Sequence, residues 1–164
     1  MPQVLILMGS DSDAPIMEAA CGVLTDLGLS WEMTVASAHR SPARVMQLVE
    51  AAPARGVRVF IVGAGAAAHL GGVVAAHSTL PVIGVPIDSS ALKGLDALLS
   101  TVQMPPGVPV ATVSIGKPGA TNAAVLAAQM IALADSDVAE RVAKYKAGLA
   151  AKVEKAAAKV EKQG

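Results

Sequence analysis

Residues 57–76 read VRVFIVGAGAAAHLGGVVAA and contain one complete unit of the pattern that predicts the architecture. The first part, Val57–Val62, is dominated by β-branched and aromatic side chains, which favour a strand. Small residues then lead into Ala68–Ala76, an alanine-rich segment that favours a helix. Because the strand does not alternate between apolar and polar residues, it should be buried on both faces, as in a parallel sheet covered by helices.

The uncharged part of this stretch, residues 59–76, is 18 residues long and on hydropathy alone is similar to a membrane span. It contains His69 and four glycines, which fit a buried strand, a tight loop and a helix better than one continuous apolar helix. The amino terminus has no basic region, and Asp11 and Asp13 come before a signal-peptide core could be complete. We therefore expect a cytoplasmic protein that has no membrane partner.

Strand-like and helix-like segments alternate along the rest of the chain. Apolar runs predict further strands at residues 4–8, 31–35, 82–85 and 110–115. Helical spacing predicts helices at residues 15–27, 42–54, 95–99 and 122–134. This repeat predicts an α/β fold, a three-layer αβα sandwich with a central parallel sheet of the flavodoxin or Rossmann type. We expect residues 1–135 to form a single catalytic domain.

Residues 136–164 predict one long C-terminal helix. Ser136 is a suitable cap, and apolar residues recur at helical spacing at Val138, Val142, Tyr145, Leu149, Val153, Ala156 and Val160. A helix that ends near Gln163 would be roughly 40 Å long, which is comparable to or longer than the diameter of a small domain. We expect it to reach another subunit and to form part of an oligomer interface. The alternative is a helix that packs on its own domain and frays after Lys152.

Composition argues against several classes of function. Thirteen basic residues balance thirteen acidic ones and aromatic residues make up 2% of the chain, so neither the charge nor the stacking surface of a nucleic-acid binder is present. The histidines, at positions 39, 69 and 77, lack the close spacing of metal ligands, so we expect no metal site. No G-x-S-x-G elbow marks a serine hydrolase. The single cysteine, Cys21, has apolar neighbours at helical spacing and predicts a core residue.

In folds of this type, binding sites lie at the carboxyl ends of the strands. The stretch SAHRSP at 37–42 follows a predicted strand and combines an imidazole, His39, with a guanidinium, Arg40. Ser41 and Pro42 fit the cap and first residue of a helix, so backbone N–H groups and Arg40 could bind a phosphate while His39 moves protons. The alternative is a surface histidine and arginine beside an ordinary helix start.

The loop MGSDSD at 8–13 follows the first predicted strand and carries two hydroxyls and two carboxylates. Carboxylates repel phosphate but accept hydrogen bonds from sugar hydroxyls, so this loop suits a ribose. The alternative is a turn in which Asp13 caps the next helix.

The loop GAGAAAH at 63–69 supports two interpretations. It fits the dinucleotide fingerprint G-x-G-x-x-A, with Asp88 placed where a ribose-binding acid would be expected, which favours a nucleotide-dependent oxidoreductase. Alternatively, alanine and glycine keep the wall of a pocket small and apolar. Two further segments, residues 88–92 and 103–107, could close that pocket or contact another subunit.

Taken together, these loops closely resemble the N5-carboxyaminoimidazole ribonucleotide mutases of bacterial-type de novo purine synthesis (class I). The resemblance covers nearly the whole chain and rests on MGSDSD at 8–13, SAHRSP at 37–42, GAGAAAHLGG at 63–72, PVIGVPIDSSALKGLD at 81–96, QMPPGVPVATVSIGKPG at 103–119 and NAAVLAAQ at 122–129. It implies a ribonucleotide substrate whose carboxylate moves from N5 to C4, an isomerase reaction. It also implies a homo-octamer with active sites near subunit boundaries and with no metal or organic cofactor.

The resemblance further implies a role for each loop. His39 is the general acid/base, Ser10 and Asp13 bind the ribose end, and Ser37 and Arg40 help to hold the 5′-phosphate. The segment Gly65–Leu70 lines the pocket in which the carboxylate is transferred. The implied substrate-binding set is Ser10, Ser12, Asp13, Ser37, Ala38, Arg40, Gly65, Ala66, His69 and Leu70.

Three positions depart from the usual pattern of these mutases. Ala66 replaces a glycine, Gly71 replaces a proline, and Pro118 replaces a small residue. Ala66 adds one methyl group to the predicted pocket wall, and we expect it to be tolerated. The animal-type relatives, which carboxylate aminoimidazole ribonucleotide with free CO₂, have a different loop containing Arg, Ser and Asn, so the stretch 68–70 favours the mutase.

Overall fold

The computed structural model describes residues 1–161 and contains a five-stranded parallel sheet in the order β2-β1-β3-β4-β5. Its strands are β1 (Val4–Met8), β2 (Trp31–Val35), β3 (Val59–Gly65), β4 (Val82–Ile87) and β5 (Ala111–Thr112). This is the flavodoxin-like strand order, so the predicted parallel sheet is confirmed.

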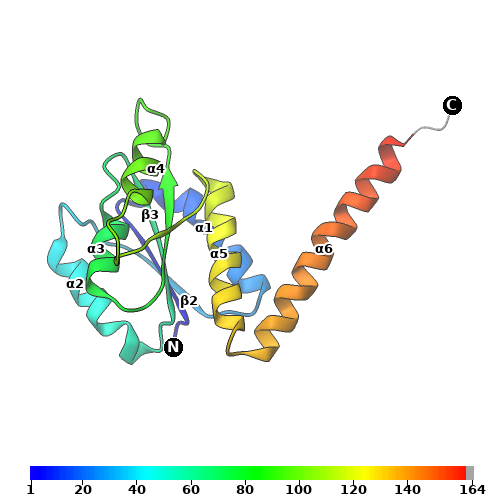
Figure 1. The fold of residues 1–164 in the computed structure, drawn as a ribbon, viewed down its shortest axis with the longest axis horizontal. Coiled ribbons are helices and arrows are strands. Elements are labelled where there is room, and N and C mark those ends of the chain that lie inside the picture. The colour runs from blue at the N-terminus through cyan, green and yellow to red at the C-terminus, as the bar shows by residue number, and fades with distance from the viewer. Residues whose placement is uncertain (162–164) are drawn as a thin grey trace.

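Residues 1–161 contain six α-helices: α1 (Ala14–Asp26), α2 (Pro42–Ala51), α3 (Leu70–His77), α4 (Leu95–Val102), α5 (Lys117–Ala132) and α6 (Ser136–Val160). Two short 3-10 helices precede α1 and follow α2, at Asp11–Asp13 and Pro53–Arg55. Helices α2, α3 and α4 cover one face of the sheet, and α1 and α5 cover the other, which makes the predicted three-layer sandwich (Figure 1). None of the helices within residues 1–161 has the length and apolar character that a membrane span requires.

The core consists of one apolar cluster on each face of the sheet. Alternate residues of β1 point to opposite sides, so Ile6 packs in the cluster under α1 and α5, and Leu7 packs in the cluster under α2 and α3. Cys21 is buried in the first cluster, as predicted. Five buried alanines of α5 let this helix approach the sheet and α1 closely; they are Ala120, Ala123, Ala124, Ala127 and Ala128. This packing holds the carboxyl ends of the strands in fixed positions.

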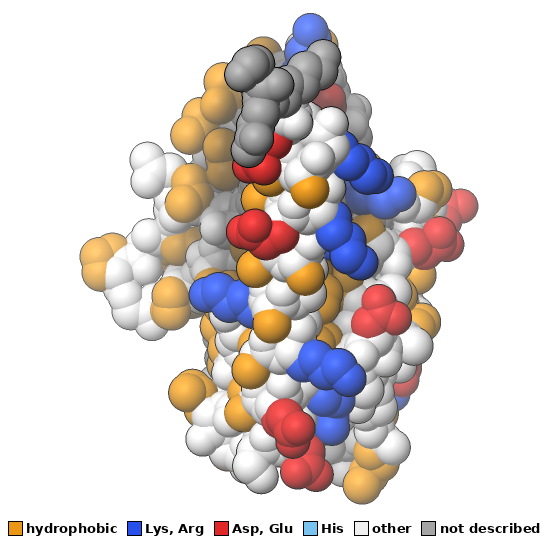
Figure 2. Space-filling model, turned by 90° about the vertical axis from the view of Figure 1, so that its right-hand side faces the viewer, with side chains coloured by type: hydrophobic (Ala, Val, Ile, Leu, Met, Phe, Trp, Pro, Cys, Tyr) orange, Lys and Arg blue, Asp and Glu red, His pale blue; other side chains and the backbone are white. Residues whose placement is uncertain are grey.

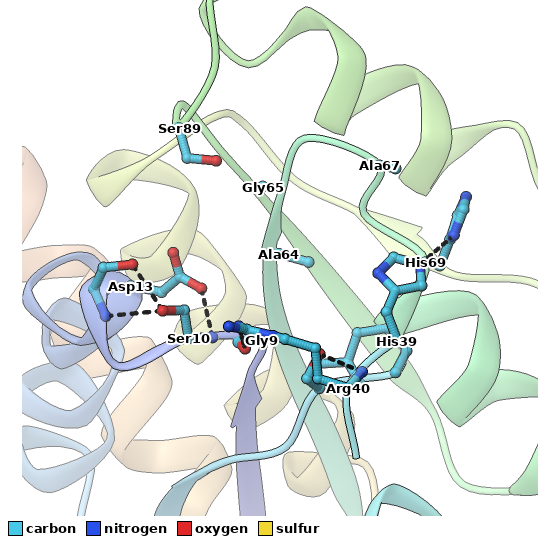
Figure 3. Close-up of a pocket in the computed structure, with 14 residues that line it drawn as sticks. Gly9, Ser10, Asp13, His39, Arg40, Ala64, Gly65, Ala67, His69 and Ser89 are labelled. Atoms are coloured by element: carbon cyan, nitrogen blue, oxygen red, sulfur yellow. Dashed lines mark hydrogen bonds between the residues drawn. The ribbon is translucent and has the colours of Figure 1, made fainter. Parts of the chain in front are cut away.

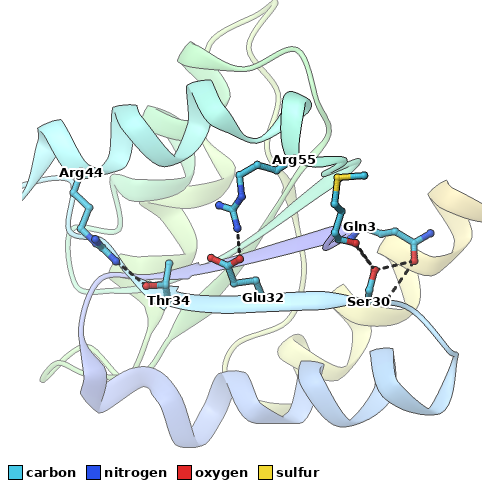
Figure 4. Close-up of polar contacts among 7 residues, drawn as sticks. Gln3, Ser30, Glu32, Thr34, Arg44 and Arg55 are labelled. Atoms are coloured by element: carbon cyan, nitrogen blue, oxygen red, sulfur yellow. Dashed lines mark hydrogen bonds and ion pairs between the residues drawn. The ribbon is translucent and has the colours of Figure 1, made fainter.

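The edge strand β2 is fastened to the layer above it by two arginines (Figure 4). The Arg44 side chain on α2 donates hydrogen bonds to the Val35 carbonyl oxygen and the Thr34 hydroxyl, both at 2.9 Å. The Arg55 guanidinium pairs with the Glu32 carboxylate. These contacts fix the strand from which the SAHRSP loop emerges.

The last predicted strand, residues 110–115, is shorter than expected and retains only Ala111–Thr112. Pro86 of β4 explains the difference. The carbonyl oxygens of Gly84 and Pro86 face β5 and accept hydrogen bonds from the N–H groups of Val113 and Gly116. A backbone N–H at position 86 would face β5 as well, but proline has none. Without that donor the ladder of hydrogen bonds cannot continue.

Helix α6 packs on the domain only along its first turns. Val138 is buried against the core and the Arg141 Nε donates a 2.7 Å hydrogen bond to the Leu27 carbonyl oxygen. The helix then leaves the domain (Figure 1), and apolar side chains remain exposed between its charged residues (Figure 2). Leu149, Val153 and Val160 are 45%, 65% and 75% exposed.

The N-cap of α6 is Asp135 rather than the predicted Ser136, because the Asp135 carboxylate accepts a hydrogen bond from the Val138 N–H. The predicted extension through residues 162–164 lies outside the described residues.

Candidate active site

The carboxyl ends of β1, β2, β3 and β4 meet at a cavity of about 190 Å³ (Figure 3). Each strand is followed by a loop that contributes to the lining, as the strand-end rule predicts. The lining residues are Gly9, Ser10, Ser12, Asp13, Ser37, Ala38, His39, Arg40, Ala64, Gly65, Ala67, His69, Leu70 and Ser89.

Most of the predicted site residues come together in this cavity. Those that line it are Ser10, Ser12, Asp13, Ser37, Ala38, His39, Arg40, Gly65, His69 and Leu70. The exception is Ala66, which is exposed and is not among the lining residues. Its φ of 50° places it in the left-handed region.

Four further residues line the cavity: Gly9, Ala64, Ala67 and Ser89. Ala67 belongs to the predicted wall Gly65–Leu70, and Ser89 belongs to the segment 88–92 that the sequence suggested could close the pocket. Gly9 and Ala64 are small residues beside predicted ones and carry no side-chain chemistry that would mark them in the sequence. They matter because they leave room for a ligand.

The loops after β2 and β3 bring two histidines into contact. The Nε2 of His39 lies 2.7 Å from the Nδ1 of His69, with ring centroids 4.8 Å apart and the rings nearly perpendicular at 79°. One of these nitrogens donates a hydrogen bond to the other, so a single proton lies between the two rings. Both side chains are exposed, which makes this proton available to a ligand in the cavity.

The loop after β1 has a compact hydrogen-bonded structure. The Asp13 carboxylate accepts from the Ser10 N–H at 3.1 Å, and the Ser10 hydroxyl accepts from the Ser12 N–H at 3.4 Å. Asp13 therefore closes its own loop and makes no capping hydrogen bond to α1, contrary to the capping alternative. Burial raises the pKa of the Asp13 carboxyl; Asp11 also raises it, whereas the Ser10 N–H and the nearby Arg40 charge lower it.

Replacement of Asp13 by asparagine should raise the melting temperature at pH 7. A raised folded-state pKa means that the fold favours the neutral acid, so this contribution to stability is present at low pH and is lost as the pH rises through the folded pKa. Asparagine cannot ionise and still accepts from Ser10. The gain over wild type should shrink as the pH falls below about 4, the ordinary carboxyl range. Two results would contradict this account: a gain in melting temperature that is the same at all pH values, or a gain no greater than that of Asp88→Asn, a replacement at an exposed site.

The loop after β2 holds Arg40 across the mouth of the first loop. The Arg40 Nη2 donates to the Gly9 carbonyl oxygen at 3.0 Å, and its backbone N–H donates to the Ser37 hydroxyl at 3.1 Å. Pro42 is the first residue of α2, as predicted, but Ser41 makes no cap to the helix. Its hydroxyl accepts from the Ser37 N–H at 3.0 Å instead. Since a guanidinium has five N–H donors, most remain for a ligand.

The glycines of the third loop serve close packing. A Cβ at Gly63 would lie 2.5 Å from the Met17 sulfur, and a Cβ at Gly65 would collide with the Ser89 hydroxyl. The N–H groups before α3 are already used, since Ala68 and His69 donate to the carbonyl oxygens two residues earlier at 2.9 and 2.7 Å. A pyrophosphate cradle needs free donors, and Asp88 lies outside the cavity lining. Both observations argue against the dinucleotide interpretation.

The described residues, 1–161, contain no group of three or more His, Cys, Asp or Glu side chains that could hold a metal ion. The His39–His69 pair is the closest approach of histidines at the cavity.

Comparison with known proteins assigns the chain to a family. Residues 3–152 match the family model described as AIR carboxylase. The N5-carboxyaminoimidazole ribonucleotide mutase of Pyrococcus abyssi is 54% identical over 146 residues, which cover 89% of this chain and 83% of that protein. The mutase of Bacillus subtilis is 55% identical over 141 residues, covering 86% and 87%.

A solved structure extends the comparison to the fold. The crystal structure of Treponema denticola PurE superimposes with a TM-score of 0.89 at 29% identity and covers 99% of this chain and 100% of that one. The match in sequence spans all the loops that line the cavity, and the match in structure spans the sheet and helices that position them. This chain is a member of the AIR carboxylase family.

Proposed function

We propose that this chain is an isomerase of de novo purine synthesis that moves the carboxylate of N5-carboxyaminoimidazole ribonucleotide from N5 to C4. The observation that carries the proposal is the convergence of a proton-sharing His39–His69 pair, an arginine and a wall of small residues on one cavity. The similarity to mutases at 54% and 55% identity supports the same reaction.

The two polar loops suit the two ends of the ribonucleotide. The Asp13 carboxylate and the Ser10 hydroxyl can accept from and donate to ribose hydroxyls. Arg40, with Ser37 beside it, offers a charged planar donor to the 5′-phosphate. The imidazole ring would then lie between His39 and the segment from Ala64 to Leu70.

The chemistry proceeds in two balanced steps. In the first, the bond between N5 and the carboxylate carbon breaks, CO₂ is released and His39 gives a proton to N5. The apolar wall of the cavity favours this step, because a carboxylate placed against it loses solvation, whereas neutral CO₂ has little solvation to lose. In the second, C4 of the enamine-like ring attacks CO₂, a carbon–carbon bond forms, and the C4 proton returns to His39. The enzyme is restored without an external reactant.

The direct test supplies purified protein with N5-carboxyaminoimidazole ribonucleotide in buffer free of ATP and added bicarbonate. Formation of 4-carboxy-5-aminoimidazole ribonucleotide, followed by NMR, is the expected result. Product that forms only from aminoimidazole ribonucleotide plus bicarbonate would instead identify a carboxylase.

We also infer that the chain works as a homo-oligomer, with an octamer as the expected state, in the cytoplasm. The distal half of α6 supports the oligomer, because Leu149, Val153 and Val160 recur at helical spacing and are exposed on one chain. A second copy of the chain is the partner that would bury them. The cytoplasmic location follows from the substrate, since phosphorylated nucleotides are retained inside cells.

Deletion of the residues after Gly148 should reduce the oligomer mass measured by light scattering while leaving the chemistry of an intact site in place. The deleted apolar side chains contribute roughly 1.5–3 kcal/mol each when fully buried, and no cavity residue is lost. Leu149→Lys with Val153→Lys should have the same effect in the full chain, and Lys144→Ala with Lys155→Ala should not. An unchanged mass and melting temperature in the truncated protein would show that α6 is a solvated helix.

A further inference from the structure

The Ser100 side chain on helix α4 contacts the turn that forms part of the cavity wall. The Ser100 hydroxyl accepts a 3.1 Å hydrogen bond from the Ala68 N–H and lies 3.4 Å from the Ala66 carbonyl oxygen. It donates its own proton to the Asp96 carbonyl oxygen, one turn earlier on α4, at 2.6 Å. Because that donation directs its lone pairs outward, the hydroxyl is oriented to accept from the loop.

The loop that Ser100 contacts is poorly supported by its own backbone. Ala66 adopts a φ of 50°, a left-handed conformation that residues with a Cβ rarely adopt. Within the loop, the N–H groups of Ala68 and His69 make tight bonds to the carbonyl oxygens of Ala66 and Ala67, two residues back. Such backbone strain persists only where contacts from the rest of the structure hold the residue in place. The hydrogen bond from Ala68 to Ser100 is such a support from outside the loop.

The position of this loop decides the geometry of the cavity. Ala67, His69 and Leu70 line the cavity on either side of Ala68, which is buried. The contact between His39 and His69 also depends on this turn, because the residue that precedes His69 is the one held by Ser100. A shift of about 1 Å in such a group can lower a rate by as much as 10²-fold.

We propose that Ser100 is a positioning residue, which holds the 66–69 turn so that its wall retains CO₂ between the two steps and His69 meets His39. The inference rests on the proposed function. Without the hydroxyl the first step still proceeds: the N–C bond breaks and N5 takes its proton. The second step competes with escape of CO₂, so free aminoimidazole ribonucleotide accumulates.

The test compares three full-length variants with wild type. Ser100→Ala removes the hydroxyl, and Ser100→Thr restores it at the same place. Thr101→Val is the matched control, because the Thr101 hydroxyl makes the same kind of bond to its own helix, to the Ala97 carbonyl oxygen at 2.7 Å, and does not contact the loop. The measurements are kcat, KM, melting temperature and the fraction of ¹³C retained from carboxylate-labelled N5-carboxyaminoimidazole ribonucleotide in unlabelled bicarbonate.

In Ser100→Ala, kcat should fall about 10- to 100-fold, KM should change little, and a smaller fraction of label should reach the C4 carboxylate. Ser100→Thr should recover both kcat and retention, and Thr101→Val should match wild type. Wild-type kcat and label retention in Ser100→Ala would overturn the inference, as would equal losses in Thr101→Val. If wild type itself does not convert the substrate, the proposed function fails first, and the inference fails with it.

Discussion

Replacement of His39 by asparagine is expected to abolish nearly all turnover while the nucleotide still binds. Asparagine keeps much of the volume of the side chain but cannot take and return a proton. A general acid–base group typically contributes about 10²–10⁴-fold, and the proposed cycle uses His39 in both steps, so the loss in kcat should lie at the upper end of that range. The measurement is single-turnover kinetics at saturating substrate, with binding followed by calorimetry.

His77→Asn provides the control for this experiment. His77 ends α3 outside the cavity lining, and its Nδ1 lies 2.9 Å from the Val73 carbonyl oxygen. Its loss should therefore leave kcat unchanged. A folded His39→Asn protein with wild-type turnover would rule out the proton-transfer scheme, whatever the identity of the product.

The second large effect is expected from Arg40→Ala, which should weaken nucleotide binding by about 10- to 150-fold. This range corresponds to the 1.5–3 kcal/mol of a hydrogen bond to a charged group. The loss should fall mainly on Kd and KM, because the phosphate does not take part in the bond changes. Calorimetry with the nucleotide and with the nucleoside that lacks the phosphate separates the two contributions. Arg40→Ala should bind the nucleotide more weakly than wild type does, and both proteins should bind the nucleoside equally well.

Arg44→Ala is the matched control for Arg40. Arg44 lies four residues further along the chain and carries the same charge, but its guanidinium bonds to β2 and it does not line the cavity. Its removal should change stability only, so binding should remain at the wild-type level. Equal affinities in Arg40→Ala and wild type would place the phosphate elsewhere in the cavity.

The parts of the fold that the sequence predicts well are those decided by local sequence pattern. β1 and β2 have the predicted bounds: β1 is an unbroken apolar run, and in β2 the apolar residues Trp31, Met33 and Val35 alternate with polar ones. The shortening of β5 depends on a donor missing from Pro86 in another strand, which no local pattern contains. The late start of α3 likewise depends on the tight turn held from α4. Both differences are tertiary effects.

The same division applies to the site. The loops could be predicted, since each strand end carries its own polar or small residues. The contact between His39 and His69 could not, because 30 residues separate them and their spacing carries no metal or catalytic signature. Ser100 was missed for the same reason. Its hydroxyl acts on a loop 32 residues away, and on its own helix it is an ordinary serine that bonds to the preceding turn.

The central claim is that CO₂ released from N5 stays in the cavity until C4 captures it, and ¹³C labelling tests this most directly. Substrate labelled in its carboxylate is converted by the wild-type protein in excess unlabelled bicarbonate, and the C4 carboxylate of the product is examined by ¹³C NMR. The wall formed by Ala64, Gly65, Ala67 and Leu70 is small and has no polar side chain, so it can hold CO₂ while offering water few hydrogen bonds, and the label should reach the product. Complete loss of the label to the bicarbonate pool would contradict the account, because the carbon would then come from solution, as in a carboxylase.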